Sequence, residues 1–256
     1  MLYPALRAHI ARAPLMSSTT FSTVVVTGAG SGIGRGIALR FLREGWRVAL
    51  VGRRATALEE TILLAGPAAA PRAAAFSCDI ANPAAVDGMA AAVLACFGRI
   101  DALINAAGTN IPRRSWNDLS REDYRNVLAA NLDGAVYCVQ AFLPTFRTQR
   151  GGTVVNINSE AGLQASAKSG VAYVASKFAL TGLTQSLNAE ERANGIRACS
   201  IFPGDVDTPL LDRRPQPPPP DARAVMLQPD DVAACVWLAV TLPPHAIVEQ
   251  LVVRPR

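Results

Sequence analysis

The sequence predicts a single α/β domain in which a parallel, doubly wound sheet of about seven strands is flanked by helices. Two patterns support this fold class. Seven short apolar runs alternate with segments long enough to form crossover helices, and a glycine-rich turn joins the first run to a helix. With 256 residues, 50% of them hydrophobic, the chain can bury one large core. No internal repeat or second block of composition divides it, so we expect one domain over residues 21–256.

The expected strands are rich in β-branched and other apolar residues, as strands buried on both faces are. The first contains three consecutive valines, Val24, Val25 and Val26. The full set covers residues 21–27, 47–51, 73–76, 102–105, 153–157, 197–202 and 247–253.

The expected helices lie between these strands. The first follows the glycine turn and places Ile33, Ile37 and Phe41 on one face, which indicates packing against the sheet. Others are predicted at residues 83–97, 118–147, 171–193 and 229–242. Proline disrupts the interior of a helix, so Pro144 is the point at which the segment 118–147 would kink.

Composition argues against several classes of function. The net charge of +5 comes from scattered arginines, without the basic block that tracks a nucleic-acid backbone. No apolar run approaches the ~20 residues needed to span a bilayer, so we expect a soluble, cytoplasmic protein without a membrane partner. The five cysteines are odd in number and widely spaced, which favours buried, reduced thiols. With only two histidines and no metal-ligand spacing, we expect no metal site.

Two segments are expected to lie outside the regular elements. Residues 1–20 have no acidic residue and contain Pro4 and Pro14, which favours a flexible N-terminal extension; a targeting peptide and a start at Met16 are alternatives. A proline-rich stretch at residues 215–220 cannot continue a helix or enter a central strand. We therefore predict a loop over about residues 205–228, placed to cover a substrate.

The glycine turn has the composition of a phosphate-binding site. Gly28, Gly32 and Gly34 stand between a predicted strand and a predicted helix, with Ser31 and Ile33 among them. Without Cβ atoms the backbone can turn sharply and approach a pyrophosphate, and the helix that follows presents free amides and the positive end of its dipole. Because Ile33 takes the place of the third glycine of the usual dinucleotide fingerprint, a merely flexible loop is the alternative.

Tyr173 and Lys177 are spaced for proton transfer. Residues four apart share one face of a helix, so the ammonium of Lys177 can lie beside the phenol of Tyr173. A neighbouring cation favours the phenolate and is expected to lower the pKa of Tyr173, which would make the phenol a usable acid or base. The alternative interpretation is that Tyr173 and Lys177 are two unrelated residues on an amphipathic helix.

Taken in order, these motifs resemble those of the short-chain dehydrogenase/reductase family, of the Tyr-x-x-x-Lys type. The resemblance covers residues 21–256 and implies a Rossmann fold. The matching residues are Gly28, Gly32, Ile33 and Gly34, then Asp79, Asn105, Gly108, Asn131, Ser159, Tyr173, Lys177, Pro203, Gly204 and Thr208. One departure is Ala106, where the family usually has a second asparagine, which removes one side-chain amide from the strand end.

The resemblance also implies roles. Tyr173 would act as general acid or base on the reacting oxygen, which Ser159 would hold by a hydrogen bond. Lys177 would bind the nicotinamide ribose, and Asn131 would hold a water for proton relay. Around the cofactor, Asp79 and Ile80 would contact the adenine, Asn105 and Gly108 would shape the floor, and Thr208 with Pro203 and Gly204 would lie at the nicotinamide end.

The residue at the end of the second strand favours NADP(H). Sites for NAD place an acid there to hold the ribose 2′-hydroxyl, whereas this chain has Arg53, which suits a 2′-phosphate. Ser31 weakens the case, because some NADP-using relatives carry a basic residue at that position. NADP(H) is therefore favoured, and NAD(H) stays open.

We expect an oxidoreductase that interconverts a carbonyl and a secondary alcohol on a small hydroxy or keto compound. A 3-oxoacyl thioester reductase is one alternative, and a cofactor-sensing protein without turnover is another. Apolar residues around the helices at 118–147 and 171–193 predict a homo-oligomer, a tetramer or a dimer. They are Tyr137, Val139, Phe142, Phe146, Phe178, Leu180, Leu183 and Leu187.

Overall fold

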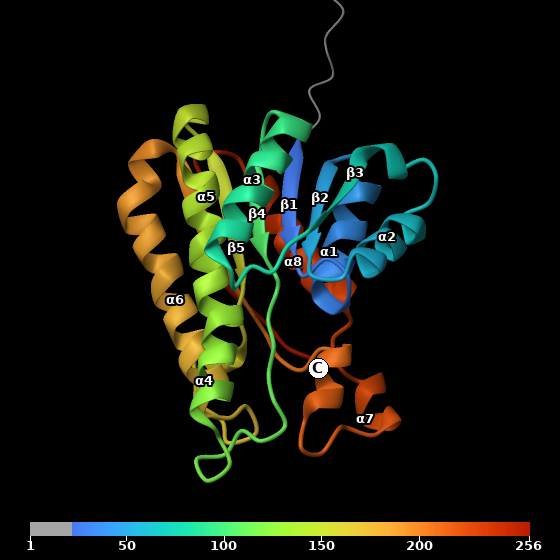
Figure 1. Cartoon of the computed structure of the whole chain (residues 1–256), viewed down its shortest axis with the longest axis vertical. Helices are drawn as coiled ribbons and strands as arrows, with labels where there is room; N and C mark the ends of the chain where they lie inside the picture. The colour runs from blue at the N-terminus through green and yellow to red at the C-terminus, as the bar shows by residue number, and fades with distance from the viewer. Residues whose placement is uncertain (1–21) are drawn as a thin grey trace, which may run out of the picture.

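The computed structural model describes residues 22–256, which form one seven-stranded parallel sheet with helices on both faces (Figure 1). The predicted extension at residues 1–20 lies outside the described residues. The strands are β1 (Thr23–Thr27), β2 (Arg47–Gly52), β3 (Ala73–Ser77), β4 (Ala102–Asn105), β5 (Gly152–Ile157), β6 (Ile196–Pro203) and β7 (Gln250–Val253). Their order across the sheet is β3-β2-β1-β4-β5-β6-β7, so the predicted fold class is confirmed.

The winding of the chain reverses direction between β1 and β4. Strand β1 pairs with β2 on one side, Val25 opposite Ala49, and with β4 on the other, Val25 opposite Leu103. The helices that follow β1 and β4 therefore leave toward opposite faces, which opens a crevice beyond the carboxyl ends of these two strands.

The helices form two layers. One layer contains α1 (Gly32–Arg43), α2 (Ala55–Leu64) and α8 (Pro229–Thr241), and its core includes the buried side chains Ile37, Phe41 and Val236. The other contains α3 (Pro83–Phe97), α4 (Arg121–Leu128), α5 (Gly134–Gln149) and α6 (Val171–Glu191). A short helix, α7 (Pro220–Ala224), belongs to the loop region below the sheet in Figure 1.

The helix predicted at residues 118–147 differs from the structure. It begins at Arg121, where Ser120 caps it by accepting a hydrogen bond from the backbone N–H of Asp123 at 2.9 Å. Its irregularity is a π-helical turn, Ala129–Asp133, between α4 and α5; Pro144 lies inside the helical run of α5. Asn131 lies within this π turn and is buried, at 2% exposure.

The last strand begins at Gln250, three residues later than predicted. The side chain of Arg197, on β6, explains the delay. Its guanidinium donates to the carbonyl oxygens of Val240, Leu242, Pro243 and Ala246 at 2.7 to 2.9 Å and so holds the chain in a turn before β7.

Two other expectations need correction. Of the eight residues expected at an interface between subunits, five are buried in the chain's own core, namely Val139, Phe142, Phe146, Leu180 and Leu187. Phe178 is the strongly exposed one of the eight, at 45%. Among the cysteines, Cys96 is exposed rather than buried, because it lies on the outer side of α3.

The continuous helical run Arg121–Gln149 is long and apolar enough to cross a membrane by length and composition alone, contrary to the expectation that no segment would be. Core helices of soluble proteins pass the same test. Here the run packs against α3, α6 and the sheet, and 39% of its most apolar window is buried.

Candidate active site

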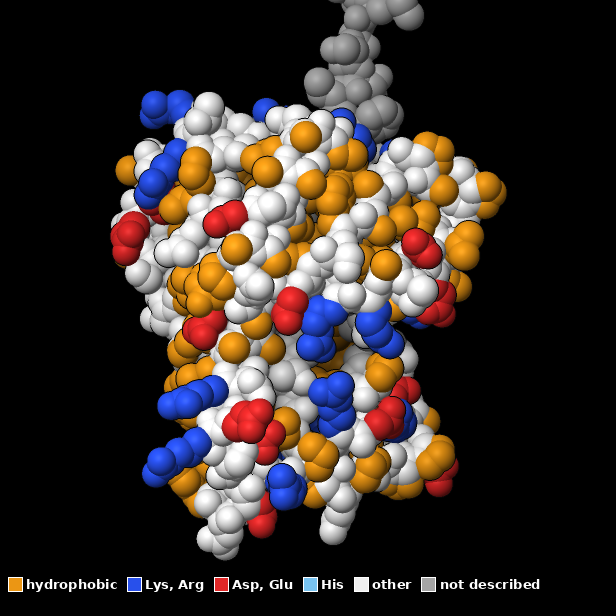
Figure 2. Space-filling model, viewed as in Figure 1, with side chains coloured by type: hydrophobic (Ala, Val, Ile, Leu, Met, Phe, Trp, Pro, Cys, Tyr) orange, Lys and Arg blue, Asp and Glu red, His pale blue; other side chains and the backbone are white. Residues whose placement is uncertain are grey.

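A cleft of about 1000 Å³ runs past the carboxyl ends of β1 to β4. Most residues predicted to hold a dinucleotide line it: Gly28, Ser31, Gly32, Ile33, Gly34, Arg53, Asp79, Ile80, Gly108, Tyr173, Lys177 and Thr208. In Figure 2, Lys and Arg side chains gather around the hollow between the upper body and the lower lobe. We call this hollow the dinucleotide cleft.

The glycines of the first turn are required by close contacts. Gly28 has a φ of 69°, and a Cβ atom there would lie 2.8 Å from the Cα atom of Ala107. A Cβ atom at Gly34 would lie 2.4 Å from the carbonyl oxygen of Gly28. The N-cap residue of α1, Ser31, makes no side-chain capping bond, so the first amides of α1 stay available. The turn therefore fits a pyrophosphate held by backbone N–H groups.

The far end of the dinucleotide cleft is basic. Arg53 and Arg54 follow β2, are exposed, and line the cleft. Asp79 follows β3, where one of its carboxylate oxygens accepts the backbone N–H of Ala81 at 3.2 Å. Ile80 is 8% exposed and packs so closely on Gly134 that a Cβ atom there would lie 2.6 Å from it. At this end of the cleft, Ile80 therefore provides an apolar floor, and Arg53 and Arg54 provide a cationic rim.

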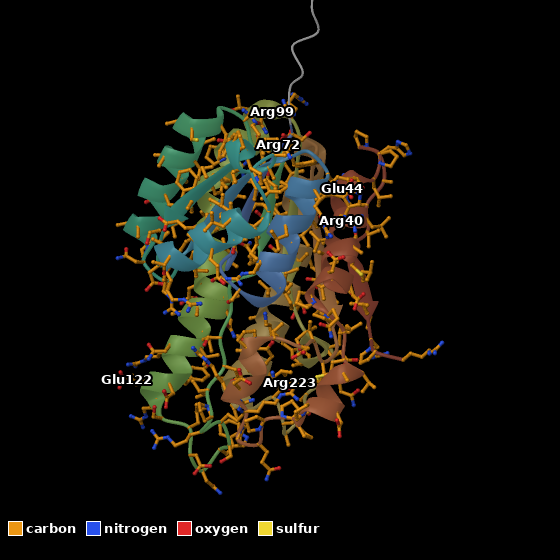
Figure 3. All side chains as sticks on the ribbon, turned by 90° about the vertical axis from the view of Figure 1, so that its right-hand side faces the viewer. Arg40, Glu44, Arg72, Arg99, Glu122 and Arg223 are labelled. Atoms are coloured by element: carbon orange, nitrogen blue, oxygen red, sulfur yellow. The ribbon has the colours of Figure 1, made fainter. Side chains whose placement is uncertain are left out.

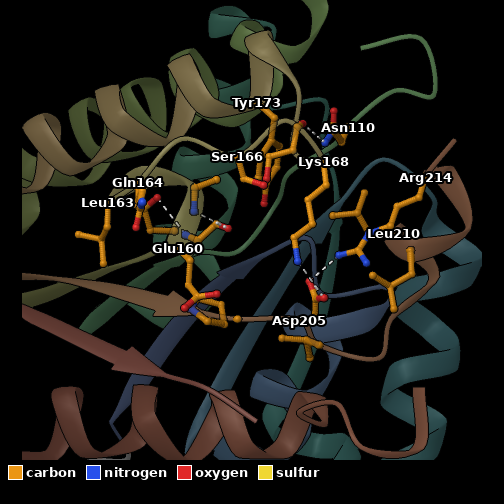
Figure 4. A pocket seen from close by; sticks show the side chains of 18 of the residues that line it. Asn110, Glu160, Leu163, Gln164, Ser166, Lys168, Tyr173, Asp205, Leu210 and Arg214 are labelled. Carbon is orange, nitrogen blue, oxygen red and sulfur yellow. Dashed lines mark hydrogen bonds and ion pairs between the residues drawn. The ribbon is translucent and has the colours of Figure 1, made fainter. Parts of the chain in front are cut away.

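A second cavity of about 600 Å³ adjoins the cleft, and we call it the side cavity. Ser159, Pro203, Gly204 and Asp205 line it, together with the segment that precedes α6 and part of the loop that follows β6 (Figure 4). Tyr173 lines both the side cavity and the dinucleotide cleft. A molecule in one can therefore meet a molecule in the other at this phenol.

The protein environment raises the pKa of Tyr173, contrary to the expected lowering. Burial is the main cause, while the hydrogen bond with Ser159 and the charges of Arg214 and Arg114 oppose it. Ser159 itself follows β5, where its hydroxyl oxygen accepts the backbone N–H of Ala161 at 3.2 Å. In the protein alone, desolvation of the phenolate outweighs the nearby positive charges.

Lys177 lies close to Tyr173 but its hydrogen bond goes elsewhere. Its ammonium nitrogen is 5.5 Å from the centre of the Tyr173 ring and donates to the carbonyl oxygen of Ile157 at 2.8 Å. The side chain is buried, and burial lowers the pKa of Lys177 to about 8. The ammonium therefore lies between the phenol and the end of β5, on the wall of the dinucleotide cleft.

Asn131 lies behind the cleft and joins three elements. Its side-chain oxygen accepts the N–H of Thr109 at 2.7 Å, and its side-chain nitrogen donates to the carbonyl oxygen of Thr109 at 3.0 Å and to the hydroxyl of Ser176 at 3.1 Å. Ser176 in turn donates to the carbonyl oxygen of Tyr173 at 2.8 Å. Both amide hydrogens are used, so only the side-chain oxygen has capacity left for a water.

Asn105 lies below the floor of the cleft. Its side-chain nitrogen donates to Asn156 at 2.9 Å, and within residues 22–256 its side-chain oxygen has no hydrogen-bond partner. Backbone N–H groups of Ala106 and Ala107 both donate to the hydroxyl of Thr27 at 3.1 Å. Thr27 thus fixes the turn after β4, where the usual second asparagine is replaced by alanine.

Sequence reasoning missed Arg114 and the pairing of Lys168 with Asp205. Arg114 is 7% exposed, and its guanidinium donates to the carbonyl oxygens of Ile111, Lys168 and Arg213 at 2.6 to 3.1 Å. These carbonyls belong to three loops that are far apart in sequence. No local pattern distinguishes Arg114 from its exposed neighbour Arg113, so this contact depends on the tertiary structure.

Comparisons with known proteins agree with the fold and the site described above. The profile of the short chain dehydrogenase family matches residues 22–218. An uncharacterized oxidoreductase of Staphylococcus aureus is 34% identical over 240 residues, which is 94% of this chain and 100% of the relative.

Two solved structures share the fold. The closed form of a serine dehydrogenase complexed with NADP+ has a TM-score of 0.82 at 31% identity, covering 91% of this chain and 94% of the other. A 3-ketoacyl-(acyl-carrier-protein) reductase from Brucella melitensis complexed with NADH has a TM-score of 0.81 at 26% identity, covering 91% and 96%. The chain accordingly belongs to the short-chain dehydrogenase family and is an oxidoreductase of that family.

Proposed function

We propose that this oxidoreductase uses NADP(H) to interconvert a carbonyl and a secondary alcohol on a small hydroxy or keto compound, with Tyr173 as the general acid or base. The observation that carries this proposal is that Tyr173 lines both the dinucleotide cleft and the side cavity. A proton donor at that junction can protonate the carbonyl oxygen of a substrate whose carbonyl carbon faces the cofactor.

The dinucleotide supplies or accepts the hydride when it is bound. The glycine turn and the amides of α1 would hold its pyrophosphate, and Lys177 would hold the ribose next to the nicotinamide. Arg53 would hold the 2′-phosphate that distinguishes NADP from NAD. The NADP+ complex of the serine dehydrogenase is consistent with this preference, and the NADH complex of the reductase leaves NAD(H) open.

Ser159 would hold the reacting oxygen beside the phenol of Tyr173, because both side chains line the side cavity. Reduction would transfer the phenolic proton to the carbonyl oxygen, and oxidation would return it. Because the protein alone raises the pKa of Tyr173, the cationic nicotinamide together with Lys177 would have to lower it for the oxidation. Asn131 would fix the loop and the helix that carry these groups.

A substrate panel tests the proposal. Purified protein is mixed with alcohols, sugars, hydroxy acids, steroids or β-ketoacyl thioesters, and NADPH or NADH absorbance is followed in both directions. Turnover of a small hydroxy or keto compound with NADP(H) is expected. Turnover confined to β-ketoacyl thioesters would support the alternative that the solved reductase represents. Tight cofactor binding without turnover of any compound would instead support a cofactor-sensing protein.

A further inference from the structure

The wall of the side cavity next to Tyr173 carries more positive than negative charge. Three cations contribute to it, namely Arg114, Lys168 and Arg214, while Asp205 is the one carboxylate paired with any of them among the described residues. The opposite rim has Glu160 paired with Arg254, which is neutral as a pair. Two positive charges are therefore in excess beside the reacting oxygen.

Arg114 is the most unusual member of this wall. Its side chain is buried, yet within residues 22–256 no carboxylate lies within salt-bridge distance of it, and its hydrogen bonds go to three neutral carbonyl oxygens. Buried charges in proteins are normally paired, because removing them from water is costly. Burial and the neighbouring charge of Arg214 lower the pKa of Arg114, which expresses this lack of a counter-ion.

Lys168 and Arg214 both reach the same carboxylate. The ammonium of Lys168 lies 3.2 Å from one oxygen of Asp205, and the guanidinium of Arg214 lies 2.5 Å from the other, as Figure 4 shows. Lys168 comes from the segment before α6 and Arg214 from the loop after β6. A single carboxylate cannot neutralise both, so an anion entering the side cavity would find hydrogen-bond donors that are still partly free.

We propose that the substrate is a small hydroxy acid, or the corresponding oxo acid, whose carboxylate binds beside Arg214 and within the field of Arg114. This rests on the proposed function, and it names the class of substrate for the same site. The reaction would convert a secondary alcohol and the oxidised nicotinamide into a ketone, the reduced nicotinamide and one proton. Leu163, Val206 and Leu210 line the remaining wall and would contact the hydrocarbon part.

The test compares compounds that differ mainly in charge. The acid 3-hydroxybutanoate, its methyl ester and 2-hydroxypropyl phosphate are each oxidised with NADP+, and their kcat/KM values are compared. We expect the acid to be preferred over the ester by about ten- to a hundredfold, the range of one charge-assisted contact. Arg214→Gln should reduce this preference to roughly threefold or less by lowering the value for the acid alone.

Arg223→Gln is the matched control. Arg223 pairs with Asp207 and Asp212 in the same loop region, in the lower part of the molecule in Figure 3. Its side chain is 23% exposed against 22% for Arg214, but it does not line the side cavity. This variant should keep the preference for the acid. If it lost the preference as Arg214→Gln does, the effect would come from loop stability and the proposal would be overturned.

Other outcomes separate this inference from the proposed function. Turnover of ester and acid with equal kcat/KM would overturn the carboxylate site and leave the oxidoreductase proposal intact. A preference for the phosphate over the acid would overturn the carboxylate assignment as well. If no compound turned over, calorimetry of butanoate with the NADP+-loaded protein would decide: binding that Arg214→Gln abolishes supports the anion site, and no binding to the native protein overturns it.

Discussion

The side-chain amide of Asn131 binds the backbone of Thr109 at both its N–H and its carbonyl oxygen, at 2.7 and 3.0 Å. Thr109 also accepts a hydrogen bond from Arg213 at 2.7 Å through its hydroxyl. The π-helical turn between α4 and α5 is thereby connected through one residue to the loop over the site. Removing the amide should disturb both the fold and the reaction.

Asn131→Ala is expected to destabilise the protein by about 1–3 kcal/mol, because the partly buried N–H of Thr109 and the buried hydroxyl of Ser176 each lose a partner. Chemical denaturation of the cofactor-free protein measures this change. Asn126→Ala, at an exposed position one turn earlier, is the control and should change stability by less than about 0.5 kcal/mol. Equal effects of the two substitutions would contradict a structural role for Asn131.

Tyr173→Phe should abolish turnover while the cofactor still binds. The substitution removes only the phenolic hydroxyl, and the glycine turn and Lys177 are retained. We expect kcat to fall by about 10²–10⁴, as for a lost general acid, with dinucleotide affinity changed by less than roughly threefold. Tyr124→Phe, on the partly exposed face of α4, should leave both quantities unchanged. A Phe variant with more than about a tenth of the native rate would exclude Tyr173 as the acid.

Arg53→Ala should weaken NADPH binding by about ten- to a hundredfold, since one charge-assisted contact to the 2′-phosphate is lost. Affinity for NADH, which lacks that phosphate, is the internal control and should stay within about threefold. Fluorescence titration of the native and variant proteins with both cofactors measures this. Unchanged NADPH affinity in the variant, or tighter binding of NADH by the native protein, would contradict the assignment.

Burial of Lys177 predicts a pH dependence of stability. Its pKa is about 8 in the folded protein against an ordinary value of 10.5, so between these values the unfolded chain binds more protons than the folded one. The contribution of Lys177 to the free energy of unfolding therefore becomes more favourable as the pH rises across that interval. At about pH 7 the buried ammonium costs on the order of 3 kcal/mol, at roughly 1.36 kcal/mol per pKa unit.

Comparing the Lys177→Met variant with the native protein tests this pH dependence of stability. The cofactor-free variant should be more stable than the native protein at about pH 7, and this difference should decline as the pH rises from about 8 to about 10.5. Because buried thiols titrate at high pH in both proteins, the difference between the two is compared rather than either value. A difference independent of pH would mean that Lys177 is not titrating in this range.

The protein is expected to form a homo-oligomer, a tetramer or a dimer, through the helical layer that contains α5 and α6. Phe178 is 45% exposed on α6, and Tyr137 and Leu183 remain partly exposed nearby, although the other expected interface residues are buried in the core. Light scattering at micromolar concentration measures the mass. A stable, active species at the 27.0 kDa of one chain would contradict the prediction, and Phe178→Asp should shift a real assembly toward that mass.

Local signals made part of the fold predictable from the sequence. The helix Pro83–Phe97 has the predicted bounds because Pro83 suits a first helical position, Asn82 accepts the N–H of Ala85 at 3.2 Å as its cap, and Gly98 ends it with a φ of 71°. The strand Ala102–Asn105 also has its predicted bounds, as a short apolar run between turns. The glycine turn was predictable for a similar reason, because Gly28 and Gly34 lie in one short stretch and a Cβ atom at Gly34 would meet the carbonyl oxygen of Gly28.

The tertiary structure decided what depends on segments that are distant in the chain. The late start of β7 follows from Arg197, which lies more than 40 residues before the turn it holds. The raised pKa of Tyr173 follows from its burial in the folded chain, which the i, i+4 spacing to Lys177 does not reveal. Arg114 and Asp205 gain their partners when three loops meet at one cavity. Sequence patterns record local spacing and polarity, so they located the motifs, while burial and long-range contacts determined the electrostatics of the site.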